Sequence, residues 1–89
     1  MPIVHVPPPY RGPTQGRAEI EVEGATVLEC LEAVEARHPG FRELVIDPKG
    51  GLHRFVRLFV NGEQLDRDAL GAAVKESDQL EVLAAIGGG

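Results

Sequence analysis

Two short segments near the N-terminus have the pattern of strands. Residues 3–6 are a mostly β-branched run that ends at Pro7-Pro8-Pro9, and proline cannot continue a paired strand because it lacks an N–H group. Residues 10–16 contain proline and glycine and are typical of a loop. Ile20 and Val22 then continue an alternation of apolar and charged residues that begins at Ala18. The chain therefore opens with a short strand and a second strand that has one face in water.

The next segment has the pattern of one amphipathic helix. Thr26 is followed three residues later by Glu29, a capping box in which each side chain can satisfy a free backbone N–H group at a helix start. Apolar residues recur at helical spacing after it, with glutamates between them, at Val27, Leu28, Leu31 and Val34. The breaker His38-Pro39-Gly40 ends the run. A helix of about three turns is predicted.

A hairpin signal follows in the second half of the chain. Residues 41–46 suit a short helical turn or packed loop, closed by the breaker at residues 47–51. Apolar Val56, Leu58 and Val60 then alternate with Phe55, Arg57 and Phe59. Asn61-Gly62 comes directly afterwards, and this pair is typical of a tight turn between two strands. The strand is therefore predicted to turn back into a short strand around Gln64-Leu65.

The last segment predicts one turn and one more strand. Asp66 or Asp68 could cap a single helical turn over residues 70–73. Leu80 and Val82 alternate with polar residues and indicate a final strand.

Strands and helix in the order β-β-α-β-β-β favour an α+β fold of the β-grasp type. We expect a mixed sheet of four to five strands packed on one main helix, with the first and last strands parallel at its centre. Residues 1–84 should form this domain, and residues 85–89 should form a flexible, glycine-rich C-terminal tail. No second domain or internal repeat is expected.

Composition and charge remove several classes of function. The net charge is −5 and the sequence has only two lysines, Lys49 and Lys75, which is a poor match to a phosphate backbone, so nucleic acid is not an expected partner. Its apolar stretches are far shorter than the roughly 20 residues needed to span a bilayer, and the N-terminus lacks a signal-peptide pattern. We therefore expect a cytoplasmic protein that does not bind membranes.

The cysteine and the histidines do not predict a metal or redox site. Cys30 has no partner for an internal disulfide and lies near the buried stripe of the helix, so it should be packed rather than reactive. His5, His38 and His53 fall in different elements without the spacing of metal ligands.

Several motifs, in their order along the chain, resemble those of the ubiquitin-like sulfur carriers of the ThiS/MoaD type. They are the Ile3-Val4-His5-Val6 strand, the helix start Thr26-Val27-Leu28, the Phe59-Val60-Asn61-Gly62 hairpin, Asp78 before the last strand, and the terminal Gly88-Gly89. Residues 52–56, Leu-His-Arg-Phe-Val, resemble in particular the CysO-like branch, which delivers sulfur for cysteine biosynthesis. Two departures are Ser77, where the family often has glycine, and an additional glycine, Gly87.

This resemblance implies a function that resides in the C-terminal carboxylate rather than in an active site. A separate ubiquitin-activating-type adenylyltransferase would adenylate the carboxylate of Gly89 with ATP and convert it to a thiocarboxylate, while the carrier itself binds no cofactor. A carboxyl with a reference pKa of about 3.3–3.7 is an anion near pH 7 and a poor electrophile until it is activated. Gly87 and Gly88 would let the tail enter a narrow channel, because glycine has no Cβ. The sequence ends at Gly89, so we expect it to be ready for activation without processing.

Strand alternation also predicts a surface for partner docking. If Val56, Leu58 and Val60 face the helix, Arg57 and Phe59 face away from it, and Leu83 and Ile86 are candidates for the same exposed side. His53 is a further candidate because it lies in the segment that resembles the CysO-like branch. An outward phenylalanine beside aliphatic residues suits an enzyme-docking patch. The alternative is that a loop covers Phe59.

Other functions remain compatible with the sequence. The chain could be a ubiquitin-like modifier joined to lysines, or a β-grasp binding module in which the tail has no role. For a sulfur carrier, the acceptor could be a cysteine precursor, molybdopterin, the thiamin thiazole or tRNA. The acceptor enzyme would then be, for example, a cysteine synthase or the large subunit of molybdopterin synthase.

Overall fold

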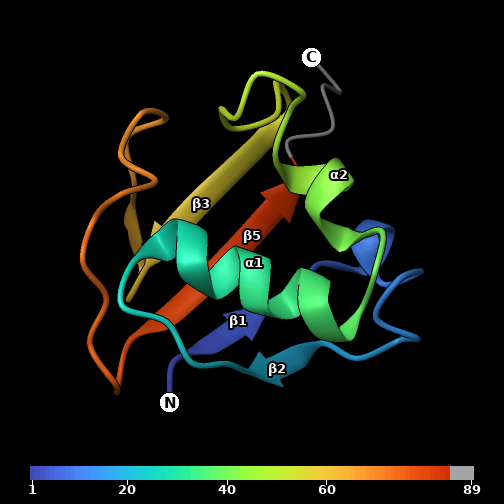
Figure 1. Ribbon diagram of the computed structural model, residues 1–89, viewed down its shortest axis with the longest axis horizontal. Coiled ribbons are helices and arrows are strands. Elements are labelled where there is room, and N and C mark those ends of the chain that lie inside the picture. Colours follow the sequence, from blue (N-terminus) through green and yellow to red (C-terminus); the bar gives the residue numbers. More distant parts are fainter. Residues whose placement is uncertain (85–89) are drawn as a thin grey trace.

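The computed structural model describes residues 1–84 and consists of one mixed sheet with its two α-helices on one face (Figure 1). The strands are β1 (Ile3–His5), β2 (Glu19–Glu21), β3 (Val56–Val60), β4 (Glu63–Gln64) and β5 (Gln79–Ala84). The helices are the single-turn 3-10 helix η1 (Pro8–Tyr10), α1 (Val27–Arg37) and α2 (Phe41–Val45).

The last strand lies at the centre of the sheet. The spatial order is β2-β1-β5-β3-β4, and β5 runs parallel to β1 but antiparallel to β3. Val4 lies opposite Leu80 in the parallel pair, and Leu58 lies opposite Val82 in the antiparallel pair. The predicted β-grasp arrangement is therefore confirmed, including the parallel pairing of the first and last strands.

The core lies between α1 and the inner face of the sheet. The helix buries Val27, Leu31 and Val34, as their spacing predicts, together with Cys30, whereas Leu28, also expected in the stripe, is only partly buried at its edge. Inward residues of the central strands meet it, namely Val4, Val56, Leu58, Leu80 and Val82, each at most 1% exposed. Burying a side chain of this size contributes roughly 1.5–3 kcal/mol, so this contact provides much of the stability of the fold.

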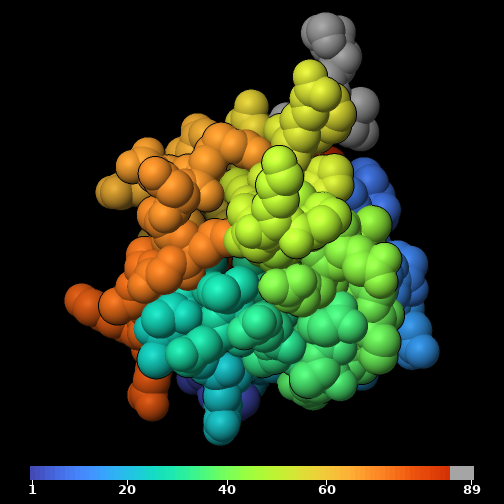
Figure 2. All heavy atoms as spheres, turned by 45° about the horizontal axis from the view of Figure 1, so that its top comes forward, coloured from blue at the N-terminus to red at the C-terminus, as the bar shows by residue number. Residues whose placement is uncertain are grey.

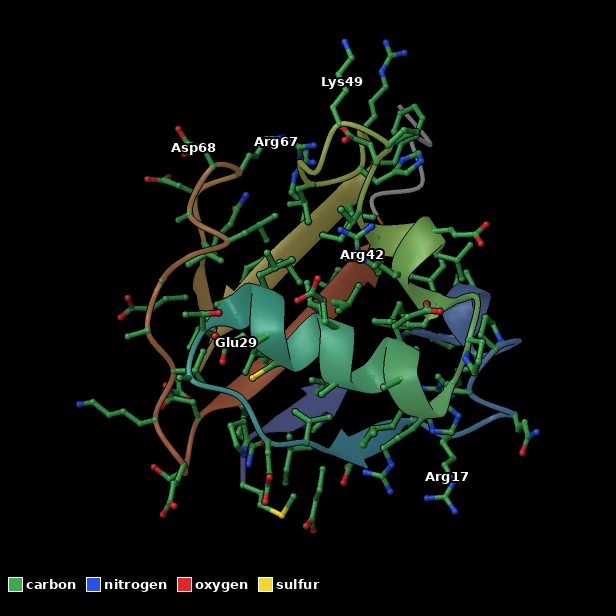
Figure 3. The ribbon with its side chains drawn as sticks, viewed as in Figure 1. Arg17, Glu29, Arg42, Lys49, Arg67 and Asp68 are labelled. Atoms are coloured by element: carbon green, nitrogen blue, oxygen red, sulfur yellow. The ribbon has the colours of Figure 1, made fainter. Side chains whose placement is uncertain are left out.

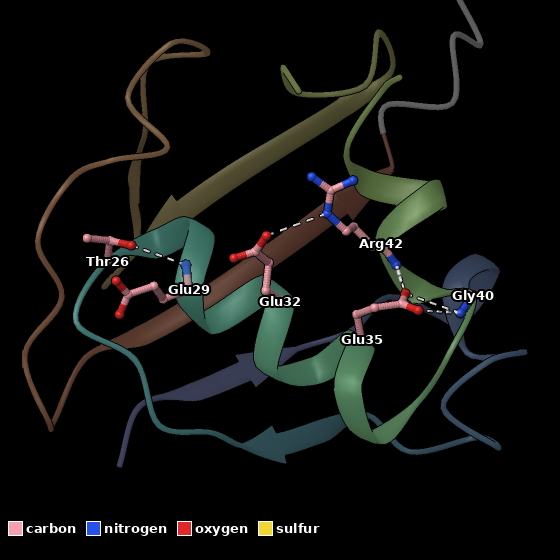
Figure 4. Close-up of polar contacts among 6 residues, drawn as sticks. All are labelled: Thr26, Glu29, Glu32, Glu35, Gly40 and Arg42. Carbon is pink, nitrogen blue, oxygen red and sulfur yellow. Dashed lines mark hydrogen bonds and ion pairs between the residues drawn. The ribbon is translucent and has the colours of Figure 1, made fainter. Parts of the chain in front are cut away.

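Side chains of Thr26 and of glutamates fix the starts of the two α-helices (Figure 4). Thr26 Oγ1 accepts a hydrogen bond from Glu29 N at 3.1 Å, as the capping box predicts, but the Glu29 carboxylate bonds Ala25 N rather than Thr26 N. Glu35 near the end of α1 accepts hydrogen bonds from Gly40 N and Arg42 N and thereby caps α2. The short α2 is held by this cap because five residues cannot form a stable helix alone.

The connection between β4 and β5 differs from the prediction. The helical turn expected over residues 70–73 is replaced by two hydrogen-bonded turns, and no side-chain cap from Asp66 or Asp68 occurs within residues 1–84. The reason is that the carbonyls of Leu70 and Ala72 accept hydrogen bonds from the N–H groups of the first turn of α1. Those amides have no partner within the helix, and a helical turn over residues 70–73 would not leave both carbonyls directed at them.

Smaller differences occur at the N-terminal strands. Residues 8–10 form η1 although a triproline run was expected only to end the strand. The first strand stops at His5, yet Val6 N still donates to Ala18 O at 2.8 Å, so the strand boundary is one residue shorter than predicted without loss of that hydrogen bond.

Candidate functional site

The chain leaves the sheet at the end of its central strand. Ala84, the last described residue, lies opposite Val56 at the start of β3, and Leu83 lies opposite Arg57. The predicted tail residues Ile86, Gly87, Gly88 and Gly89 lie outside the described residues. The elements that surround this exit point are therefore the start of β3 and the segment of chain before it (Figure 1).

The outer face of the sheet carries the side chains that alternation places away from α1. Arg57 and Phe59 are half-buried on this face, and Leu83 is 38% exposed, whereas their neighbours Val56 and Leu58 are buried. The predicted orientation of this strand is confirmed. Phe59 is accordingly neither a core residue nor a fully exposed one.

One row of side chains crosses all five strands on that face. Strand pairing aligns Glu19, His5, Glu81, Phe59 and Gln64, so Phe59 lies between the polar side chains of Glu81 and Gln64. The ring of His5 lies between two carboxylate-bearing positions, and its Nε2 is 2.6 Å from Gln79 Oε1. Arg57 and Leu83 lie opposite one another beside this row, so the half of the outer face near β3 carries the apolar and cationic groups.

Residues 47–55 form an ordered loop beside the exit point. Asp47 Oδ1 accepts hydrogen bonds from Lys49 N at 2.9 Å and from Gly51 N at 3.0 Å. His53 N donates to Val45 O at 2.7 Å, and the His53 ring accepts from Arg54 N at 3.1 Å. The predicted partner residue His53 is therefore half-buried and takes part in holding the loop.

A side chain from the connection between β4 and β5 anchors this loop. The Arg67 guanidinium donates to three carbonyls, at 2.9 Å to Leu52 O, 2.7 Å to His53 O and 3.0 Å to Val56 O. Figure 3 shows Arg67 at the end of the molecule that also carries Lys49. Hydrogen bonds from a charged donor are stronger than neutral ones, so Arg67 fixes the loop to the start of β3.

The opposite end of β5 is fixed by a polar network. Asp78 accepts hydrogen bonds from Asn61 Nδ2 and Lys75 N, both at 2.9 Å, and Gln79 N donates to Asn61 Oδ1. Asn61 and Gly62 both have positive φ, as a tight hairpin turn requires. The hydrogen bond from Lys75 N, together with that from Asn61, lowers the pKa of the Asp78 carboxyl below its ordinary value.

Cys30 is packed as predicted. Its side chain is fully buried on α1, and burial together with the nearby Glu29 and Asp78 carboxylates raises the pKa of the thiol. Within residues 1–84, no group of three histidine, cysteine or acidic side chains is arranged to hold a metal ion. No helix in that part of the chain is long and apolar enough to cross a membrane.

Two features near the exit point were not among the predicted site residues. Phe55 is 52% exposed, with the Arg54 guanidinium 5.5 Å from the centre of its ring. The outward position of Phe55 could have been predicted, because Phe55 belongs to the alternating strand pattern. The role of Arg67 could not have been predicted from the sequence, because its three acceptors lie between 11 and 15 residues away.

Comparisons with known proteins agree over nearly the whole chain. The model of the ThiS family matches residues 8–89. Sulfur carrier protein CysO of Mycobacterium tuberculosis is 33% identical, over 97% of this chain and 96% of its own, and its crystal structure matches with a TM-score of 0.89. A chain of the BexX/CysO complex of Amycolatopsis orientalis is 38% identical, with a TM-score of 0.91 and all of both chains covered. SAMP1 of Haloferax volcanii is 26% identical, with a TM-score of 0.78 and 99% and 98% of the two chains covered.

Proposed function

The chain belongs to the ThiS family, and we propose that its sulfur is carried as a thiocarboxylate on Gly89. Like the CysO proteins that it resembles over its length, it is a sulfur carrier rather than a catalyst. The observation that best supports Gly89 as the reacting end is the position of Ala84. The chain leaves a central strand there, five residues before Gly89, opposite the start of β3.

Residues 85–89 are long enough and, at their glycines, narrow enough to enter a channel in a partner enzyme. At about 3.3–3.6 Å per residue, five extended residues reach roughly 16–18 Å beyond the sheet. Three terminal glycines present no Cβ to the walls of a channel. The folded domain can then stay outside while the carboxylate meets ATP inside the partner.

The proposed chemistry needs two steps in the partner enzyme. A carboxylate oxygen of Gly89 attacks the α-phosphorus of ATP, and pyrophosphate leaves with the electron pair of the broken P–O bond. A sulfide donor then attacks the acyl carbon, AMP leaves, and the C-terminus becomes a thiocarboxylate. ATP belongs to the activating enzyme in this scheme, and the carrier holds no cofactor of its own.

We assign partner docking to the apolar and cationic half of the outer face. Arg57 and Leu83 lie next to the exit point, Phe59 lies two residues further along β3 on the same face, and Ile86 and His53 complete the proposed surface. An activating enzyme of the ubiquitin-activating type and a separate sulfur-acceptor enzyme are the proposed partners. The CysO of Amycolatopsis orientalis has been crystallised in complex with BexX, which supports a carrier that docks as a folded unit.

Likeness to CysO favours a cysteine precursor as the sulfur acceptor, and hence an acceptor enzyme of the cysteine synthase type. Residues 52–56 support the same choice, because they resemble the CysO-like branch. Molybdopterin, the thiamin thiazole and tRNA are the other acceptors to be compared in a delivery assay.

A second candidate function is protein modification. It is favoured by the likeness to SAMP1, a small archaeal modifier protein. Conjugation would join the activated carboxyl of Gly89 to a lysine amine with loss of AMP. Immunoblotting for larger adducts in a lysate separates the two functions, because a pure carrier forms none.

The test of the proposed function is ATP–pyrophosphate exchange with the cognate activating enzyme. The native chain should support exchange. Deletion of Gly88-Gly89 shortens the reach by roughly 7 Å at about 3.3–3.6 Å per residue and should abolish it. One alanine added after Gly89 should abolish it too, because a Cβ then adjoins the carboxylate. Exchange by the truncated chain, with an unchanged melting temperature, would show that the tail is not the reacting end.

A further inference from the structure

The loop beside the exit point carries positive charge in a chain whose net charge is −5. Lys49 and Arg54 are exposed on it, next to the exposed ring of Phe55. We call Lys49, Arg54 and Phe55 the rim. The acidic residue of the same loop, Asp47, is half-buried, and one of its carboxylate oxygens accepts two backbone N–H groups. The rim therefore presents cations and an aromatic ring to solvent.

Hydrogen bonds hold the rim in place on both sides. Asp47 closes the turn that carries Lys49, and Arg67 donates to the carbonyls of Leu52, His53 and Val56 around Arg54 and Phe55. An isolated bridge joins Ile46 to Leu52 across the base of the loop. A surface held in this way loses little conformational entropy when a partner binds it.

The rim borders the point from which the tail departs. Phe55 precedes Val56, and Val56 lies opposite Ala84. Figure 2 shows the yellow-green loop, around residue 50, projecting from the top of the molecule. A partner that takes in the tail must bring the mouth of its channel close to this loop.

We propose that the rim docks on a carboxylate-rich surface of the activating enzyme, around the mouth of the channel that receives the tail. This inference rests on the proposed function and adds to it a surface outside the sheet face. Arginine and aromatic residues are enriched at protein interfaces, and opposite charges across an interface accelerate encounter. The sequence has only nine basic residues against fourteen acidic ones, so most of the carrier surface would repel a carboxylate-rich partner. A local cluster of cations near the tail would then direct the partner to the end of the carrier that must react.

A protein partner fits the rim better than RNA. Two cations and one ring are too few to follow a phosphate backbone, and the surrounding acidic charge would repel it. The Arg54 guanidinium 5.5 Å above the Phe55 ring presents a flat apolar and cationic surface, which suits contact with a protein.

The decisive variant is the double substitution Lys49→Glu with Arg54→Glu, measured by adenylation kinetics. We expect kcat/KM to fall by about tenfold or more at low salt with kcat unchanged, because only encounter is affected. Raising the ionic strength should lower kcat/KM of the native chain and should have little or the opposite effect on the variant. Phe55→Ala should lower kcat/KM without changing its salt dependence.

Arg17→Glu is the control, matched in charge change to each of the two substitutions made singly. Arg17 is equally exposed but lies in the loop before β2, at the end of the molecule away from Lys49 (Figure 3), and the change should leave kcat/KM nearly native. Circular dichroism should confirm that all variants are folded.

Three results would overturn the proposal. If the native chain is adenylated and the double variant has the same kcat/KM and salt dependence, the rim has no docking role while the proposed function stands. A gel shift of RNA by the native chain at physiological salt, lost in the double variant, would assign the rim to RNA. If the native chain is never adenylated, the proposed function fails and the rim proposal fails with it.

Discussion

At the scale of single residues, burial distinguishes side chains that stabilise the core from side chains that a partner protein can reach. Cys30 is fully buried, and a Cβ added at Gly24 would lie 2.9 Å from both the Cys30 N and Sγ atoms, so the thiol has no room for a reacting partner. Phe59 and Phe55, by contrast, are aromatic residues that the fold leaves partly or largely uncovered. Sulfur chemistry therefore has no thiol available to it within residues 1–84.

Cys30→Ala should leave sulfur delivery unchanged, because the proposed function places the transferred sulfur on Gly89 and not on the thiol. The free energy of unfolding should fall by about 1 kcal/mol, since removal of the sulfur leaves a small void in the core. Urea unfolding and a sulfur-delivery assay measure the two effects. A folded variant that no longer delivers sulfur would assign the chemistry to the thiol.

Phe59→Ala should weaken binding to the activating enzyme more than it weakens the fold. Half-buried aromatic anchors of this type commonly contribute about 1–2 kcal/mol or more to binding. The matched control is the neighbouring Leu58→Ala, which empties a fully buried site and should cost about 2–5 kcal/mol of stability. A large drop in melting temperature for Phe59→Ala, with native adenylation kinetics, would show that Phe59 serves the fold alone.

At the scale of elements, local patterns predicted almost every helix and strand. The main helix α1 and strand β3 were predictable because their buried residues recur with the helical and strand periods. The hairpin at Asn61-Gly62 was predictable because that turn requires positive φ. These signals lie within a few residues of the structure that they specify.

Most of what the sequence did not reveal depends on contacts between distant segments. The use of the Leu70 and Ala72 carbonyls by α1 is one such contact, and the anchoring of the loop by Arg67 is another. The cap of α2 by Glu35, by contrast, is local in sequence but is not a standard capping pattern. The outer face of the candidate site was predictable from alternation, whereas the rim beside the exit point required the three-dimensional arrangement.

Asp78, which joins the Asn61-Gly62 hairpin to the start of β5 by hydrogen bonds, should make the free energy of unfolding depend on pH. Hydrogen bonds to Lys75 N and Asn61 hold the pKa of Asp78 below its ordinary value. A lowered pKa in the folded state means that the ionised carboxylate stabilises the fold above the unfolded pKa of about 3.9 and that this contribution is lost as the pH falls through the folded value.

Asp78→Asn should therefore lower the melting temperature at neutral pH, and the gap to the native chain should narrow as the pH falls below about 4. Thermal unfolding followed by circular dichroism from neutral to acidic pH measures this gap. Asp68→Asn is the control, because the Asp68 side chain makes no hydrogen bond within residues 1–84, and its profile should follow the native one. A gap for Asp78→Asn that is constant with pH would exclude the ionised carboxylate as its source.

At the scale of the whole molecule, the β-grasp topology separates the fold from the reacting end. The last strand, β5, lies in the centre of the sheet, where it is hydrogen-bonded to β1 on one side and to β3 on the other. The chain leaves the sheet at Ala84, the last residue of this strand. In the proposed function, the domain supplies the docking surface and the C-terminal residues supply the reacting group. This division of roles would let a chain of 89 residues act as a carrier with its reacting group outside the folded domain.

Intact-protein mass spectrometry tests this account most directly. The native chain is incubated with ATP, its cognate activating enzyme and a sulfide source, alongside the chain that lacks Gly88-Gly89 and the chain with one added alanine. The native chain should gain the mass of sulfur minus that of oxygen, the gain should localise to the C-terminal peptide, and both variants should keep their original masses. A native chain that never gains this mass with a verified enzyme, or a truncated chain that does gain it, would contradict the assignment of Gly89 as the sulfur-carrying group.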